Sequence, residues 1–108
     1  MYLHYMEDIF EFSKIEHERQ VNHHNVKNDP KTKYTMLAKL MEELGELSEA
    51  ILSYDSLQRT DKLDNAKNNL EDELADVILV TLILSNELGV DVKNAINKKI
   101  QKIKSRKY

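Results

Sequence analysis

The sequence of 108 residues contains no cysteine and no tryptophan, and it has only one proline and two glycines. Without cysteine the chain can form neither a disulfide nor a thiolate metal site, and it is compatible with a reducing compartment. So few turn-forming residues leave little room for the many turns of a β fold. Helices are therefore the expected secondary structure.

Targeting and membrane signals are also absent from the sequence. The start, MYLHYMEDIF, is acidic and has neither the basic n-region nor the continuous apolar h-region of a signal peptide. No apolar run approaches the roughly 20 residues that a membrane span needs. We therefore expect a cytoplasmic protein with no membrane partner. The length is close to that of a common domain, which predicts a single domain over residues 1–108.

Acidic and basic residues are separated along the chain. Residues 93–108 contain seven Lys and Arg residues and no acid, whereas residues 1–92 contain nine bases and 19 acids. Such a basic segment can bind nucleic acid, face an acidic surface of the same protein, or hold phosphates beside a metal.

Hydrophobic periodicity predicts four helices and hence an all-α fold. The expected helices cover about residues 2–20, 35–55 and 64–88, and a last one follows Asp91. Asp91 is expected to be the N-cap of the last helix, and Gly89 is expected to end the third.

The third predicted helix contains LADVILVTLIL, residues 74–84, in which nine of eleven residues are apolar. A helix that is apolar around its whole circumference must be buried on several sides. In so small a chain this implies a second subunit, and we expect a homo-oligomer, either a dimer or a tetramer. Asp76 lies inside this run, where an ionised carboxylate is costly unless it is paired or bound to a metal.

Acidic residues recur at a fixed spacing on the second and third predicted helices. Glu43 and Glu46 are an i, i+3 pair, and so are Glu73 and Asp76. Such a pair projects from one helix face, so two antiparallel helices can bring all four carboxylates together. Four carboxylates are a site for a hard cation such as Mg²⁺ or Mn²⁺. Taken singly, each segment is also typical of a solvated helix face or of an acidic first turn.

The four histidines do not suggest a metal site. His4, His17, His23 and His24 have no HxxxH or HExxH spacing, and we expect them on the surface and in loops. A di-iron carboxylate bundle is not favoured, because the sequence has no Glu-x-x-His pair.

The segment EELGE (42–46), followed after 26 residues by ELAD (73–76), resembles the EExxE…ExxD signature of the MazG-like all-α nucleoside triphosphate pyrophosphohydrolases. The resemblance covers roughly residues 35–108. It implies a four-helix bundle that assembles through the apolar third helix. It also implies a Mg²⁺-dependent hydrolase that converts a (d)NTP to a (d)NMP and pyrophosphate with a water that the metal orients.

The resemblance also implies a role for individual residues. The Mg²⁺ ligands would be Glu43, Glu46, Glu73 and Asp76, with Mn²⁺ as a substitute ion. The catalytic carboxylates would be Glu42, Glu46 and Glu49, with Glu42 or Glu49 orienting the water. The phosphate contacts would be Lys99, Lys102 and Arg106.

Two departures from the family pattern concern the substrate. Ile103 stands where members often have an asparagine, and a base would have to stack on Tyr34, Tyr54, Phe12 or a histidine, because no tryptophan is present. The alternatives are a phosphoribosyl-ATP pyrophosphohydrolase-like enzyme, or a non-catalytic helical oligomer or nucleic-acid-binding module that uses the basic segment. The sequence leaves open the base and sugar, the number of metal ions and the glutamate that orients the water.

Overall fold

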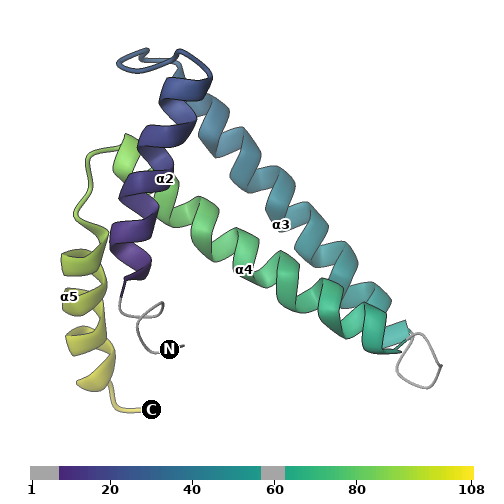
Figure 1. Ribbon diagram of the computed structural model, residues 1–108. Helices are drawn as coiled ribbons and strands as arrows, with labels where there is room; N and C mark the ends of the chain where they lie inside the picture. The colour runs from purple at the N-terminus through teal and green to yellow at the C-terminus, as the bar shows by residue number, and fades with distance from the viewer. Residues whose placement is uncertain (1–7, 57–62) are drawn as a thin grey trace. The chain divides into compact units, whose positions relative to one another are not determined.

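The computed structural model describes residues 8–56 and 63–108. Over these ranges it contains four helices and no strand (Figure 1). The helices are α2 (Ile9–His23), α3 (Thr32–Ser56), α4 (Leu63–Glu87) and α5 (Val92–Lys104). The prediction of an all-α fold is confirmed, although the expected start of the first helix lies outside the described residues.

The end of α4 and the start of α5 are built as the sequence predicts. Gly89 has φ +68°, and its N–H donates to the carbonyl of Asn86, while the N–H of Val90 donates to that of Ser85. These two hydrogen bonds form the Schellman motif. The motif needs one residue in the left-handed conformation, which glycine adopts at low cost. Asp91 is the N-cap of α5, since its side chain accepts from the N–H of Asn94 at 3.1 Å.

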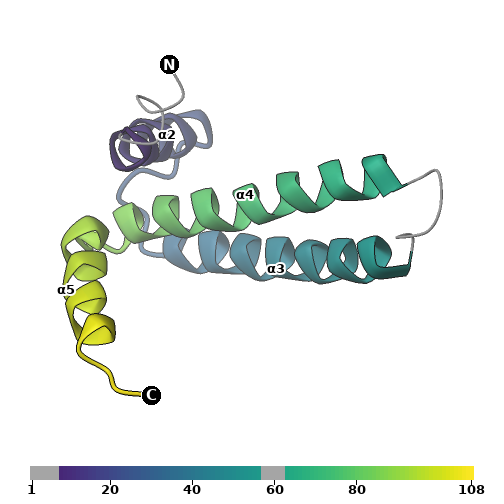
Figure 2. The same cartoon turned by 90° about the horizontal axis from the view of Figure 1, so that it is seen from below.

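The chain divides into two compact units. The hairpin unit, Pro30–Thr81, contains α3 and the first part of α4, which run side by side and antiparallel (Figures 1 and 2). The terminal unit combines Met1–Asp29 with Leu82–Tyr108, and so contains α2, the end of α4 and α5.

The described residues of the hairpin unit form almost no apolar core of their own. Among its described residues, the only buried apolar side chains are Ala50 and Ala66, which are 2% and 8% exposed. Large apolar side chains on the same two helices stay 45–70% exposed; they are Leu37, Met41, Leu44, Ile51 and Leu52 on α3, and Leu74 and Ile78 on α4. Two alanines bury far less apolar area than these residues could bury.

The apolar run at residues 74–84 is therefore buried unevenly within one chain. Leu82 and Ile83 are 5% and 6% exposed, whereas Leu74 and Ile78 are each 49% exposed. Burial on several sides stays a prediction about an assembly of more than one chain.

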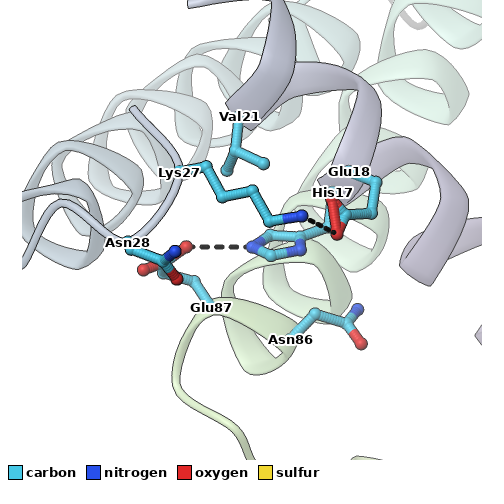
Figure 3. A pocket seen from close by; sticks show the side chains of 7 residues that line it. All are labelled: His17, Glu18, Val21, Lys27, Asn28, Asn86 and Glu87. Atoms are coloured by element: carbon cyan, nitrogen blue, oxygen red, sulfur yellow. Dashed lines mark hydrogen bonds and ion pairs between the residues drawn. The ribbon is translucent and has the colours of Figure 1, made fainter. Parts of the chain in front are cut away.

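In the terminal unit, polar contacts join α2 to the last turn of α4, and Val21 of α2 is buried. Asn86 Nδ2 donates to Ser13 Oγ at 3.1 Å, and the Ser13 hydroxyl donates to the Phe10 carbonyl. His17 Nε2 lies 2.9 Å from Glu87 Oε1, and each of these side chains is 17% exposed (Figure 3). His17, which was expected on the surface, is thus only partly exposed on α2, while His23 and His24 are exposed and His4 lies outside the described residues.

The last helix, α5, buries none of its residues. It approaches α2 where Lys93 Nζ lies 5.9 Å from the centre of the Phe10 ring. None of the helices in the described ranges is both long enough and apolar enough to cross a membrane.

Candidate metal centre

Three carboxylates of the hairpin unit converge between its two helices. Glu43 of α3 and Glu73 and Asp76 of α4 each place one oxygen within 4.8 Å of the other two. Glu43 is buried, and the other two side chains are partly buried. The antiparallel packing of α3 on α4 brings the two i, i+3 pairs to the same level, because each pair projects from one face of its helix.

Glu46 lies near two of these three carboxylates, Glu43 and Glu73. The charge of Glu43 raises the pKa of Glu46 above its ordinary value, and partial burial and the charge of Glu73 raise it further. Three of the four acids whose spacing predicted a shared site, Glu43, Glu73 and Asp76, therefore form one cluster, which we call the carboxylate cluster together with the neighbouring Glu46.

Asp76 is also affected by these surroundings. Partial burial raises its pKa most, followed by the charges of Asp72 and Glu43, while Lys39 acts in the opposite direction. Burial and the nearby negative charges thus both favour the protonated form of Asp76.

Two oxygens of the carboxylate cluster are buried and have no hydrogen-bond partner. They are Glu43 Oε2 and Glu73 Oε2. A buried carboxylate oxygen without a partner costs about 1–3 kcal/mol or more, which a native structure seldom tolerates without a reason. Hard divalent cations take carboxylate oxygens of this kind as ligands, so the donor set fits Mg²⁺ or Mn²⁺.

Lys39 also belongs to this site, although it lies outside the acidic sequence motifs. Its Nζ lies 3.0 Å from Glu43 Oε1 and 3.9 Å from Glu42 Oε2. A hydrogen bond to Glu43 and the charge of Glu42 raise the pKa of Lys39. The signal was present in the sequence, because Lys39 precedes these glutamates by three and four residues and therefore lies beside them on a helix.

The other predicted site residues are exposed. Glu42 and Glu49 are on the surface of α3, and Glu42 is in contact with Lys39. Lys99 and Lys102 of α5, and Arg106 just after it, are exposed in the terminal unit. Their contact with phosphates beside the carboxylate cluster stays a prediction.

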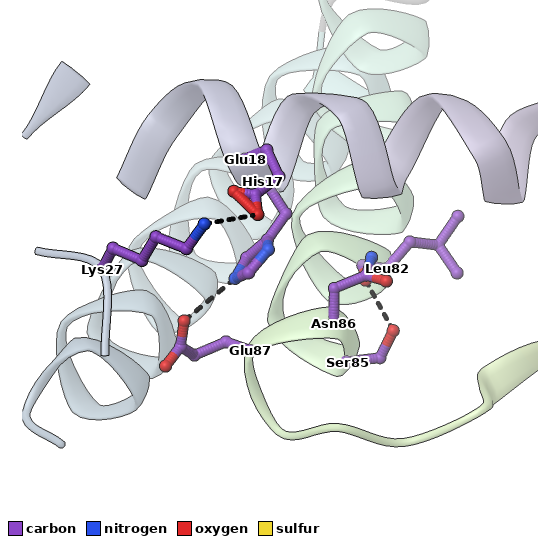
Figure 4. Close-up of polar contacts among 7 residues, drawn as sticks. All are labelled: His17, Glu18, Lys27, Leu82, Ser85, Asn86 and Glu87. Carbon is purple, nitrogen blue, oxygen red and sulfur yellow. Dashed lines mark hydrogen bonds and ion pairs between the residues drawn. The ribbon is translucent and has the colours of Figure 1, made fainter. Parts of the chain in front are cut away.

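The terminal unit contains a pocket of about 230 Å³ (Figure 3). It is lined by His17, Glu18, Val21, Lys27, Asn28, Asn86 and Glu87. Its charged groups are already paired, because Lys27 Nζ lies 3.4 Å from Glu18 and His17 contacts Glu87 (Figure 4). We assign it no role in the chemistry.

Comparison with known families agrees with this geometry. The sequence model of the MazG nucleotide pyrophosphohydrolase domain matches residues 31–108. The chain belongs to this family. The matched MazG domain includes α3, α4 and α5, and with them the whole carboxylate cluster, whereas α2 precedes it. No curated protein and no solved structure matches the chain.

Proposed function

We propose that the protein is a metal-dependent nucleoside triphosphate pyrophosphohydrolase. It converts a (d)NTP to a (d)NMP and pyrophosphate. The observation that carries this proposal is the carboxylate cluster, with two buried oxygens that lack partners. Membership of the MazG family supports the reaction class.

The carboxylates of Glu43, Glu46, Glu73 and Asp76 would hold Mg²⁺, or Mn²⁺ in its place. A bound ion would act as a Lewis acid and neutralise phosphate oxygens of the substrate. The raised pKa values of Glu46 and Asp76 support this assignment, because crowded carboxylates gain from a cation among them.

The remaining groups would act on the water and on the phosphates. Attack at the α phosphorus needs a water that is oriented and loses a proton, and Glu42 or Glu49 would provide the base. Lys99, Lys102 and Arg106 would stabilise the negative charge of the leaving pyrophosphate. The separation of an acidic segment from a basic segment along the chain supports this division of roles.

We also propose that the protein works as a homo-oligomer, a dimer or a tetramer. The support is the hairpin unit, whose buried apolar side chains in the described range are two alanines while seven large apolar side chains stay at least 45% exposed. Exposed apolar area of this kind is typical of an interface. A two-fold dimer would pair the same faces of two copies.

One experiment tests the reaction. The purified protein is given canonical and modified NTPs and dNTPs, and phosphoribosyl-ATP, with Mg²⁺ in ¹⁸O-labelled water, and EDTA serves as the control. We expect Mg²⁺-dependent release of pyrophosphate and label in the monophosphate. Label found only in pyrophosphate or orthophosphate would contradict attack at the α phosphorus. Turnover of phosphoribosyl-ATP alone would favour the related enzyme instead.

A nucleic-acid-binding module is the other outcome to distinguish, because α5 carries the basic segment and buries none of its residues. Salt-sensitive binding of DNA without any nucleotide turnover would favour this function over hydrolysis.

A further inference from the structure

Lys39 is a cation held at the carboxylate cluster by a contact that the proposed chemistry does not use. Its Nζ lies 3.0 Å from Glu43 Oε1. The Glu43 side chain is 7% exposed, whereas the Lys39 side chain is 54% exposed. The ion pair thus joins a buried acid to a lysine whose side chain reaches into solvent.

The two oxygens of Glu43 are in different situations. Oε1 accepts the contact from Lys39, whereas Oε2 is buried and has no partner. A lysine brings a single compact charge, which cannot neutralise four neighbouring carboxylates. In its observed position, however, the Lys39 ammonium group occupies Oε1 of Glu43, an oxygen that could otherwise bind a divalent cation. Its positive charge would also repel a divalent cation at the same site.

We propose that Lys39 is the counter-ion of the metal-free site and that it leaves Glu43 when a divalent cation binds. Its flexible four-carbon side chain allows the ammonium group to turn away into solvent without a change in the backbone. This inference rests on the metal site of the proposed function, but it requires no turnover. In the presence of a nucleotide, the released ammonium group is available to a phosphate.

The direction in which removal of Lys39 changes the affinity for the metal distinguishes this counter-ion role from a positioning role. If Lys39 competes with the metal, its removal ends both the competition for Glu43 and the charge repulsion, so the metal binds more tightly. If Lys39 instead holds Glu43 in the orientation that the metal needs, its removal makes the metal bind more weakly.

The test uses Mn²⁺ alone, titrated into the full chain without nucleotide and followed by electron paramagnetic resonance. For Lys39→Met we expect a dissociation constant about three- to tenfold lower than that of the wild type, as loss of an ion pair and of charge repulsion implies. Lys39→Arg keeps the charge and should bind Mn²⁺ no more tightly than the wild type.

Lys67→Met is the matched control, because Lys67 is an exposed lysine of α4 with no ion pair in the described part of the chain. It makes the same change in net charge, and its affinity for Mn²⁺ should equal that of the wild type. A second measurement is the melting temperature in EDTA, which should fall further for Lys39→Met than for Lys67→Met. Saturating Mn²⁺ should remove this difference.

An equal or higher dissociation constant for Lys39→Met, with Lys67→Met unchanged, would overturn the inference. If neither the wild type nor Lys39→Met bound Mn²⁺, the metal site and the inference would both fail. If the exchange at Glu43 occurred but no nucleotide were hydrolysed, the proposed reaction would fail and the role of Lys39 would stand.

Discussion

At the scale of single residues, Asp76 is the member of the carboxylate cluster that lies within an apolar run. It is partly buried within an apolar run, and Asp72 and Glu43 add negative charge near it. We expect Asp76→Asn to lower Mg²⁺-dependent turnover by at least about a hundredfold, since a metal ligand is lost. Steady-state kinetics and circular dichroism would check this together, because helicity should be retained. Full activity in the variant would show that the four-acid site is wrong.

Raised pKa values also predict how the stability of the metal-free protein depends on pH. The folded protein keeps protons on Asp76 and Glu46 at a pH where the unfolded chain has already lost them. The unfolded state therefore binds fewer protons, and stability falls as pH rises from the ordinary carboxylate range, about 4, through the raised values.

Denaturant unfolding in EDTA at a series of pH values would measure this effect. The free energy of unfolding should decrease across that window, and the decrease should be smaller in Asp76→Asn. Saturating Mg²⁺ should oppose the loss, because a bound cation stabilises the folded state. A metal-free stability that rises through the window would contradict the predicted sign.

Sequence spacing could predict which acids converge, but not every contact they make. Glu43, Glu73 and Asp76 meet because an i, i+3 spacing fixes the face of a helix on which a side chain lies. The partial burial of His17 could not be predicted in this way, because its partner Glu87 is 70 residues away and only the packing of α2 on α4 brings them together.

At the scale of elements, helix ends depend on a few local residues. Gly89 ends α4 at φ +68°, a conformation that a residue with a Cβ adopts at a cost. We expect Gly89→Ala to lower the free energy of unfolding by about 1 kcal/mol, and Gly89→Asn to lower it less. Denaturant unfolding of both variants would check the order, and an equal loss in both would contradict it.

Gly45 provides the comparison, since it lies inside α3 and an added Cβ would meet no atom within 4 Å. Within a single chain, Gly45→Ala should gain up to about 1 kcal/mol of helix propensity. A loss of stability in this variant, accompanied by weaker self-association, would indicate that a second copy approaches α3 closely at this glycine.

The sequence could predict those helix boundaries that are marked by a local signal, such as a capping residue. Asp91 and Gly89 act within one turn of the chain, and both ends were predicted correctly. The start of α3 was predicted at residue 35, three residues too late, because no apolar periodicity marks its first turn. That turn contains the buried Thr32, whose burial depends on tertiary packing.

At the scale of the whole molecule, the exposed apolar side chains of the described residues favour the proposed assembly. Ile78 of α4 is 49% exposed, and a surface substitution there would change the stability of a monomer little. We expect Ile78→Lys to dissociate the oligomer and to lower its stability. Sedimentation at micromolar concentration would measure the change, with Asn68→Lys on exposed α4 surface as the charge-matched control.

A wild-type protein that sediments as a well-folded monomer would contradict this prediction. The sequence could indicate that these faces are apolar, because periodicity shows which residues share a face. It could not indicate what covers them, since that depends on the shape of a surface on another copy.

In the described residues of the hairpin unit, the buried apolar side chains are two alanines, and this has a consequence for the synthesis and the purification of the protein. If association supplies the burial that this unit lacks, then folding and assembly obey mass action as one equilibrium. The melting temperature should then rise with protein concentration, and dilution alone should unfold the chain. A newly synthesised copy would gain much of its stability only on meeting a second one, so the cellular abundance of the protein would set the fraction that is folded.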